Sequence, residues 1–182
     1  MNEMNVEVGA GGTPWVKFLH ESFTNNASNV VFLDHGETIS DISPKQGKRI
    51  QGDTSAIPLK AESTDLIFGK DVFGSERESK GLYVGPVGDL NEIASEWFRV
   101  CKPGAHALIL EVNTPQDAPI EKLRNAFEKA GFKLEKEYKG VDEISGLFKE
   151  NASESVKRTF STGIDYPNTE YDKSYALSFV KP

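Results

Sequence analysis

NVEVGAGGTPW, residues 5–15, is the stretch that indicates the fold, because a short β-type run leads into a glycine cluster. Thr13 and Pro14 follow the glycines, and both suit the first positions of a helix. Glycine permits positive φ angles and close approach of a ligand to the main chain. The free N–H groups of a helix start favour a carboxylate or a phosphate. The stretch predicts a strand, a turn and a helix with room for an anion, although a tight turn alone would also need glycine.

Two familiar nucleotide-binding motifs do not fit this loop. A dinucleotide fingerprint G-x-G-x-x-G would need glycine at position 14, where Pro14 stands, and this weighs against NAD or FAD. A Walker loop would need Gly-Lys-Ser/Thr, which the stretch lacks. An acidic residue, Asp34, ends the next apolar run, where a carboxylate can accept hydrogen bonds from ribose hydroxyls. A strand-end cap is the ordinary alternative for Asp34.

Apolar runs alternate with helical periods along the rest of the chain, which predicts an α/β sheet with right-handed crossovers. In the best helix, Asp89 and Glu92 form a capping-box-like start, and Pro103 and Gly104 end the helix. The predicted strands are residues 5–8, 29–34, 48–53, 64–69, 105–112, 133–140 and 175–182. The predicted helices are residues 13–23, 88–104 and 119–132.

Two segments do not follow this alternation. Residues 70–88 are rich in glycine and charge, and residues 141–174 are polar with a weak helical pattern. Insertions of this length usually contact substrates or are mobile. The chain of 182 residues is long enough for one domain with a real core and short for two. We therefore expect one domain over residues 1–182, with variable insertions at about 70–88 and 141–174.

Composition narrows the classes of function. A formal net charge of −7 is poorly suited to holding phosphate backbones, so nucleic acid is a disfavoured partner. The single cysteine, Cys101, excludes an intrachain disulfide and a cysteine metal cluster. No apolar stretch approaches the roughly 18 residues of a membrane span, and no signal-peptide pattern opens the chain. A cytoplasmic protein is the resulting expectation.

Several motifs together resemble those of class I S-adenosylmethionine-dependent methyltransferases. They stand in the family's order, cover most of residues 5–135, and are VEVGAGGT, VVFLD, IQGDTSAIPLKAESTDLIFGKDVF, EWFRVCKPGAHALILEV and FEKAGFKL. The stretch from GDTSAIPL to DLIF and the FRVCKPG turn are similar to the small-molecule branch that includes enzymes of the ubiquinone-biosynthesis type. The resemblance implies a Rossmann-like, doubly wound sheet that is mostly parallel and has an antiparallel closing strand. It also implies S-adenosylmethionine as the cofactor.

The resemblance also implies which residues hold that cofactor. Glu7 matches the acidic residue that helps to position the methionine end, and Asp34 matches the acid that binds the ribose. Asp53, with Thr54 beside it, matches the residue that contacts the adenine amino group. The glycines with matching positions are Gly9 and Gly11 under the ligand, and Gly69 where the fourth strand ends and the methyl-donor pocket begins. Asp53 could instead be an ordinary turn residue.

Two departures from the family pattern concern the same loop. The family often has Gly-x-Gly-Thr-Gly, whereas this chain has Gly11, Gly12 and Thr13, which displaces the third glycine. The family also has helices before its first strand that help to cover the cofactor, and about five residues precede the strand here. We therefore expect a more exposed cofactor, a protein partner that covers the open side, or a cover formed by the later insertions.

Catalytic residues are not identified by the sequence. Methyl transfer needs alignment of the acceptor and exclusion of water, and it needs a general base only when the acceptor must lose a proton. The candidates near the expected pocket are Lys70, Asp71, Tyr83 and Glu111, and residues of these types in such positions are more often solvated or structural than catalytic bases. His20, His35 and His106 show no metal-ligand spacing or nucleophile–base pattern. Trp97, Phe98 and Cys101 are expected in the core.

Three functions remain open at this stage. The first is S-adenosylmethionine-dependent methyl transfer to a small molecule. The second is a methyltransferase-like domain without catalysis that serves as a protein-interaction module, as in the N-terminal domain of the anamorsin family, which this chain resembles in length and in its start. This chain keeps the glycine loop that the anamorsin domain has lost. The third, a nucleotide- or NAD-binding protein, is opposed by Pro14.

Overall fold

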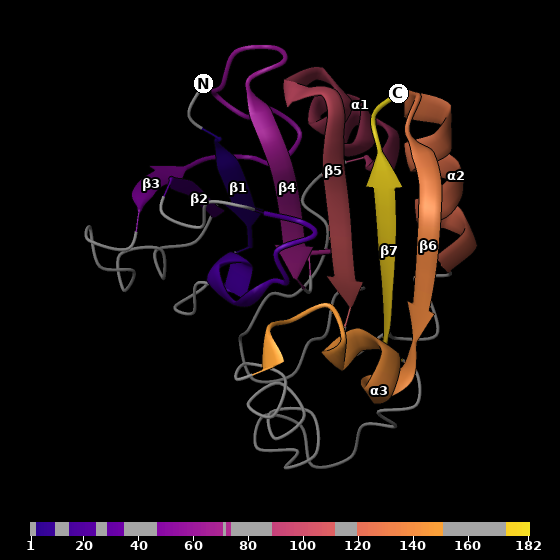
Figure 1. Ribbon diagram of the computed structural model, residues 1–182. Coiled ribbons are helices and arrows are strands. Elements are labelled where there is room, and N and C mark those ends of the chain that lie inside the picture. The colour runs from indigo at the N-terminus through magenta and orange to yellow at the C-terminus, as the bar shows by residue number, and fades with distance from the viewer. Residues whose placement is uncertain are drawn as a thin grey trace, which may run out of the picture.

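The computed structural model describes residues 3–9, 15–24, 29–34, 47–70, 72–73, 89–111, 120–150 and 174–182. Within these residues the chain forms a seven-stranded sheet in the order β3-β2-β1-β4-β5-β7-β6 (Figure 1). The strands are β1 Asn5–Val8, β2 Val30–Asp34, β3 Lys48–Gln51, β4 Thr64–Lys70, β5 Cys101–Glu111, β6 Lys133–Lys139 and β7 Tyr175–Val180. All seven predicted strands are therefore confirmed in existence and type.

The strand directions match the predicted sheet. β1 pairs in parallel with β2 and with β4, and further parallel pairs join β2 to β3 and β4 to β5. β7 runs antiparallel to both of its neighbours, β5 and β6. A mostly parallel sheet with an antiparallel closing strand is confirmed. The parallel strands end at one edge, which is the lower edge in Figure 1.

The inner strands are buried on both faces because helices or loops cover both. All four residues of β1 are buried, as are four of the five in β2. The two outer strands are polar instead: β3 reads KRIQ and β6 reads KLEKEYK, and neither has a fully buried residue. Charged, exposed edge strands hinder pairing with other chains.

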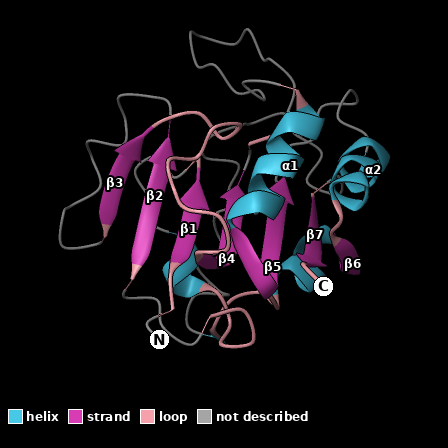
Figure 2. Ribbon diagram, turned by 90° about the horizontal axis from the view of Figure 1, so that it is seen from above, coloured by secondary structure: helices cyan, strands magenta, loops and turns pink. Residues whose placement is uncertain are grey.

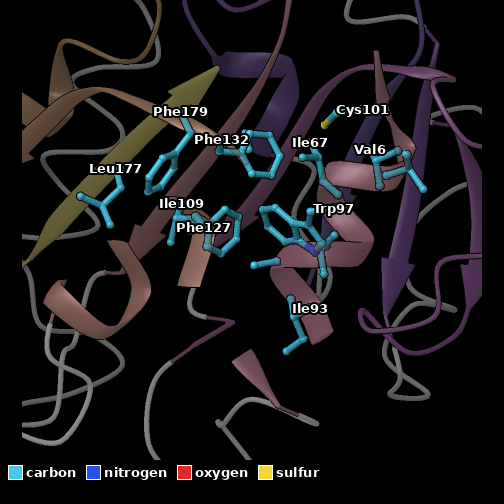
Figure 3. Packing of buried hydrophobic residues seen from close by; sticks show 14 of the residues in the cluster. Val6, Ile67, Ile93, Trp97, Cys101, Ile109, Phe127, Phe132, Leu177 and Phe179 are labelled. Atoms are coloured by element: carbon cyan, nitrogen blue, oxygen red, sulfur yellow. The ribbon is translucent and has the colours of Figure 1, made fainter. Parts of the chain in front are cut away.

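One face of the sheet is covered by α1 Leu90–Val100 and α2 Ile120–Ala130 (Figure 2). The apolar residues of each helix recur on one side, which packs on the strands. The Trp97 and Phe127 rings meet edge to face, with centroids 5.4 Å apart. Figure 3 shows these two side chains among the buried residues of this face. Asp89 caps α1 by accepting a hydrogen bond from the backbone N–H of Asn91 at 2.7 Å. The expected core positions of Trp97 and Cys101 are confirmed.

The opposite face has less helix than the sequence predicts. The helix predicted for residues 13–23 is wrong over its described part, which forms only a 3₁₀ turn, η1, over Trp15–Phe18. After this turn the chain pairs with a distant segment: the N–H of His20 donates to the carbonyl of Leu147 at 2.7 Å, and the N–H of Lys149 donates to the carbonyl of Phe18 at 2.8 Å. These long-range bonds replace the local bonds that would have extended the helix.

The start of the segment 141–174 packs against the sheet, and its assignment as a variable insertion stays a prediction. α3 spans Gly140–Ser145, and the buried side chains Ile144, Leu147 and Phe148 pack with those of Val16 and Leu19. These residues therefore belong to the core that covers this face of the sheet. Residues 151–173 lie outside the described part of the chain.

The predicted end of the first long helix is shifted as well. α1 ends at Val100, and β5 begins at Cys101, ahead of Pro103 and Gly104. The pairing of β5 with β4 shifts register between Thr64 and Leu66. The Pro-Gly pair thus lies in an irregular strand start, where Gly104 has a φ of +80°.

Replacing Phe148 tests whether this segment is core. Phe148 is buried and meets the Trp15 ring edge to face. We expect Phe148→Ala to lower the free energy of unfolding by about 3–5 kcal/mol, because a large buried side chain is lost. The exposed neighbour Glu150 gives the matched control: Glu150→Ala should change it by less than about 0.5 kcal/mol. Equal effects of the two variants in urea unfolding would contradict the assignment.

Candidate functional site

The predicted site residues that the structure describes gather at the carboxyl edge of the parallel strands. Gly9 follows β1, and its N–H donates to the carbonyl of Leu33 at 2.9 Å. Asp34 ends β2, and its carbonyl accepts a hydrogen bond of 3.0 Å from the N–H of Gly52, just beyond β3. Asp53 is the next residue. The structure therefore brings Gly9, Asp34 and Asp53 to neighbouring strand ends, where open α/β sheets place their ligands.

Glu7 is fully buried and binds the main chain beyond the glycine cluster. Its two carboxyl oxygens accept hydrogen bonds from the N–H groups of Trp15 and Val16, both at 2.9 Å. Burial raises the pKa of Glu7 to about 8, although the two backbone bonds and the charges of Lys70 and Lys17 oppose the rise. Glu7 thus connects β1 directly to the start of η1.

Gly9 is required by the backbone and by its neighbour. Its φ of +67° lies in the left-handed region, which costs an L residue roughly 1–2 kcal/mol. A Cβ atom at this position would lie 2.8 Å from a methyl carbon of Val72. The glycine therefore permits both the turn out of β1 and close packing of Val72 against it.

Gly69 is explained by packing in the interior. A Cβ atom here would lie 2.8 Å from the Trp97 ring and 3.2 Å from the Val72 methyl carbon. The glycine near the end of β4 thus provides the space that these two side chains occupy. Its predicted place beside a methyl-donor pocket stays a prediction, and the structure supplies a packing role as well.

Asp53 and Thr54 differ in exposure and in partners. One Asp53 carboxylate oxygen accepts hydrogen bonds from the N–H and the hydroxyl of Ser55, both at 2.8 Å, while the residue is only partly buried. Thr54 is buried, and its hydroxyl oxygen accepts a 2.8 Å bond from the indole N–H of Trp97. Asp53 is therefore accessible at the edge, whereas Thr54 connects the β3–β4 segment to α1.

Of the four candidate catalytic residues, the structure describes Glu111 and Lys70. Glu111 is 1% exposed, and one of its carboxylate oxygens accepts bonds from the N–H groups of Val72 at 3.0 Å and Phe73 at 2.9 Å. Lys70 lies over the Trp15 ring, 5.2 Å from its centroid. Glu111 therefore anchors the backbone after β4, which is a poor position for a general base. Gly11, Asp71, Tyr83 and His35 lie outside the described residues.

The two described histidines make polar contacts on the surface. His20 is exposed and hydrogen-bonds to Ser22 at 3.1 Å, and His106 contacts Glu135 at 3.0 Å. Burial raises the pKa of the Cys101 thiol to about 11, which keeps it protonated. In the described ranges no three metal-ligating side chains come together, and no helix is long and apolar enough to cross a membrane.

Two residues near the site were missed by the sequence reasoning. Val72 carries no chemical motif, and only its contacts with Gly9 and Gly69 reveal its position. Tyr175 lies opposite Glu111 in the β5–β7 pairing and is 2% exposed, and its hydroxyl has no hydrogen-bond partner among the described residues. Burial and the Glu111 carboxylate raise the pKa of Tyr175, so its hydroxyl stays protonated. The pairing of a buried glutamate with this tyrosine depends on strand register, which the sequence does not fix.

Comparison with solved structures identifies the fold. No family model and no curated protein sequence matches the chain. A TehB-like S-adenosylmethionine-dependent methyltransferase from Corynebacterium glutamicum is 14% identical, with a TM-score of 0.63 over 99% of this chain and 80% of that one. The [4+2]-cyclase SpnF is 15% identical, with a TM-score of 0.61 over 100% and 75%.

A third similar structure contains the cofactor. Phosphoethanolamine N-methyltransferase 2 from Haemonchus contortus, in complex with S-adenosyl-L-methionine, is 13% identical, with a TM-score of 0.61 over 100% of this chain and 49% of that one. Identities this low show the fold alone, and this fold hosts more than one reaction. The chain has the Rossmann-like fold of class I S-adenosylmethionine-dependent methyltransferases.

The pKa of Glu7 predicts how stability depends on pH. Because that pKa is about 8 in the folded protein and roughly 4.3 in an unfolded chain, the folded state binds more protons between these values. The contribution of Glu7 is fully present below about pH 4 and is lost as the pH rises toward 8. We expect the unfolding free energy of Glu7→Gln, measured in urea, to fall less between pH 5 and pH 8 than that of the wild type. The exposed-site control Glu121→Gln should keep the wild-type slope, and a wild-type slope in Glu7→Gln would contradict the assignment.

Proposed function

We propose that this protein binds S-adenosylmethionine at the carboxyl edge of its parallel strands and transfers the methyl group to a small-molecule acceptor. The observation that carries the proposal is the convergence of Gly9, Asp34 and Asp53 at adjacent strand ends. It is supported by the similarity of the fold to that of a methyltransferase in complex with this cofactor.

The described residues fit the adenosyl part of the cofactor. Asp34 and Asp53 are partly buried, so their carboxylates are within reach of a ligand at the edge. We assign Asp34 to the ribose hydroxyls, because a carboxylate accepts two such bonds, and Asp53 to the adenine amino group. Gly9 leaves the end of β1 without a side chain that would crowd the ligand. Glu7 contributes indirectly, because its carboxyl group binds the backbone N–H groups of Trp15 and Val16, which follow the glycine loop.

The bound cofactor would supply an activated methyl group on a sulfonium. The protein's own task is then to hold the acceptor in line and to keep water out, which supplies much of the rate in such reactions. Buried aromatic side chains near the end of β4, such as Phe73 and Trp97, provide apolar surroundings behind the edge. The net charge of −7 favours a small molecule over a nucleic acid as the acceptor.

A second candidate function, a protein-interaction module without catalysis, is favoured by a different observation. Several predicted cofactor residues are already engaged within the fold: Glu7 with backbone N–H groups, Thr54 with Trp97, and Gly69 under the Trp97 ring. These side chains and this glycine thus have roles inside the fold that need no cofactor. Such a module could use the same edge to contact a protein partner.

Measuring the binding of a cofactor analogue distinguishes a methyltransferase from an interaction module. We expect S-adenosylhomocysteine, the demethylated product, to bind the wild type in isothermal titration calorimetry. Asp34→Asn should weaken its affinity about 10- to 100-fold, because a hydrogen bond to a charged group contributes about 1.5–3 kcal/mol. Asp65→Asn is the matched control: Asp65 lies at the start of β4, bound to Lys102, and its change should leave the affinity unaltered.

Three results would overturn the proposal. No heat and no thermal shift with millimolar S-adenosylhomocysteine would favour the interaction module. Binding that is equally strong in wild type and in Asp34→Asn would place the ligand elsewhere. A thermal shift with NAD in place of the homocysteine ligand would favour the dinucleotide alternative. A ligand present at 100 times its Kd stabilises a protein by about 2.7 kcal/mol, so even modest affinity is measurable.

A further inference from the structure

Glu111 holds two consecutive backbone N–H groups with a single oxygen atom. It is the last residue of β5, and its Oε1 accepts bonds from the N–H of Val72 at 3.0 Å and from that of Phe73 at 2.9 Å. Glu111 is 1% exposed, so water does not compete strongly for these bonds. Residues 72–73 are therefore fastened to the end of a neighbouring strand.

The fastened segment places Val72 in a niche between two glycines. Val8 pairs with Gly69 across β1 and β4, so Gly9 and Gly69 lie close together at the ends of these strands. A Cβ atom would lie 2.8 Å from the Val72 methyl carbon at Gly9 and 3.2 Å from it at Gly69. Side chains at either position would displace Val72. Because neither glycine has a side chain, the Val72 side chain packs directly against the main chain of both.

Phe73 holds the same segment from the apolar side. Its ring meets the Trp97 ring at 5.5 Å and the Phe127 ring at 5.9 Å, both edge to face. The segment is therefore fixed by a polar contact to β5 and by aromatic contacts to α1 and α2. Two independent attachments leave Val72 little freedom to move away from Gly9.

We infer that Glu111 is a positioning residue: by binding the Val72 and Phe73 amides it sets Val72 against Gly9 and thereby shapes the surface under the cofactor. This inference rests on the proposed function, because it assigns the surface at Gly9 to S-adenosylmethionine. It gives Glu111 a role through Val72 in place of a direct role as a base. It also explains why a carboxylate lies buried at the end of β5.

The geometry supplies a conservative variant. Both N–H groups bond to the same oxygen, so Glu111→Gln keeps an acceptor where Glu111→Leu has none. We expect amide hydrogen exchange at Val72 and Phe73 in the ligand-free protein, followed by NMR, to stay within about threefold of wild type in Glu111→Gln. In Glu111→Leu it should be at least tenfold faster. The affinity for S-adenosylhomocysteine should follow the same order, with Glu111→Leu at least tenfold weaker.

A second variant, Val72→Ala, distinguishes a positioning role of Glu111 from a general loss of stability. Val72→Ala keeps both amides and removes the side chain, so we expect nearly wild-type exchange together with weaker ligand binding. Combined with Glu111→Leu, it should weaken binding by less than the product of the two single effects, because both act through one side chain. Ile144→Val, on the opposite face of the sheet, is the control that lowers stability without changing affinity.

The outcomes are distinct for the two proposals. Wild-type exchange at Val72 and Phe73 in Glu111→Leu would overturn the inference, as would loss of affinity in Glu111→Gln equal to that in Glu111→Leu. If Glu111→Leu does not fold, unchanged affinity in Val72→Ala would overturn it. If wild type binds no S-adenosylhomocysteine, the proposed function fails and the assigned role under the cofactor fails with it, while the exchange data still decide whether Glu111 holds the segment.

Discussion

The carboxyl group of Glu7 accepts hydrogen bonds from the backbone of Trp15 and Val16, and the arrangement of the site depends on this contact. It joins an inner strand to the chain that emerges from the glycine cluster, and both oxygens are used. Glu111, at the end of β5, likewise accepts hydrogen bonds from two consecutive backbone N–H groups, those of Val72 and Phe73. Two buried glutamates thus tie two connecting segments to the sheet, and for Glu7 the backbone bonds offset the desolvation cost only in part, because its pKa is raised.

Strand positions followed from the sequence because each apolar run is short and bounded by polar or glycine residues. The helices on one face, α1 and α2, followed from the sequence because their apolar residues recur with helical periodicity. The predicted helix at residues 13–23 was wrong because its described residues bond to Leu147 and Lys149, more than a hundred positions away. Such pairing overrides local propensity, and no local pattern reports it. The buried role of Ile144 and Phe148 was missed for the same reason.

The candidate site, like the fold, was predictable from the sequence only in part. Gly9 and Asp34 could be placed at strand ends because the end of a strand is visible in the sequence. The internal partners of Thr54 and Gly69, both involving Trp97, could not be foreseen because they depend on how α1 packs. Val72 has no distinctive chemistry and becomes important only through the two glycines around it. The acceptor is undetermined for a further reason: one fold supports many reactions, and chemistry resides in the residues placed upon it.

The most direct test of the central claim is a map of where the ligand binds. Titration of the ¹⁵N-labelled protein with S-adenosylhomocysteine, followed by NMR, reports each backbone amide separately. Binding at the carboxyl edge predicts that the largest saturable shifts occur at Gly9, Asp34 and Asp53, with little change at β6 or at Asp65. Saturable shifts confined to β6 or the amino edge, or none at millimolar ligand, would contradict it.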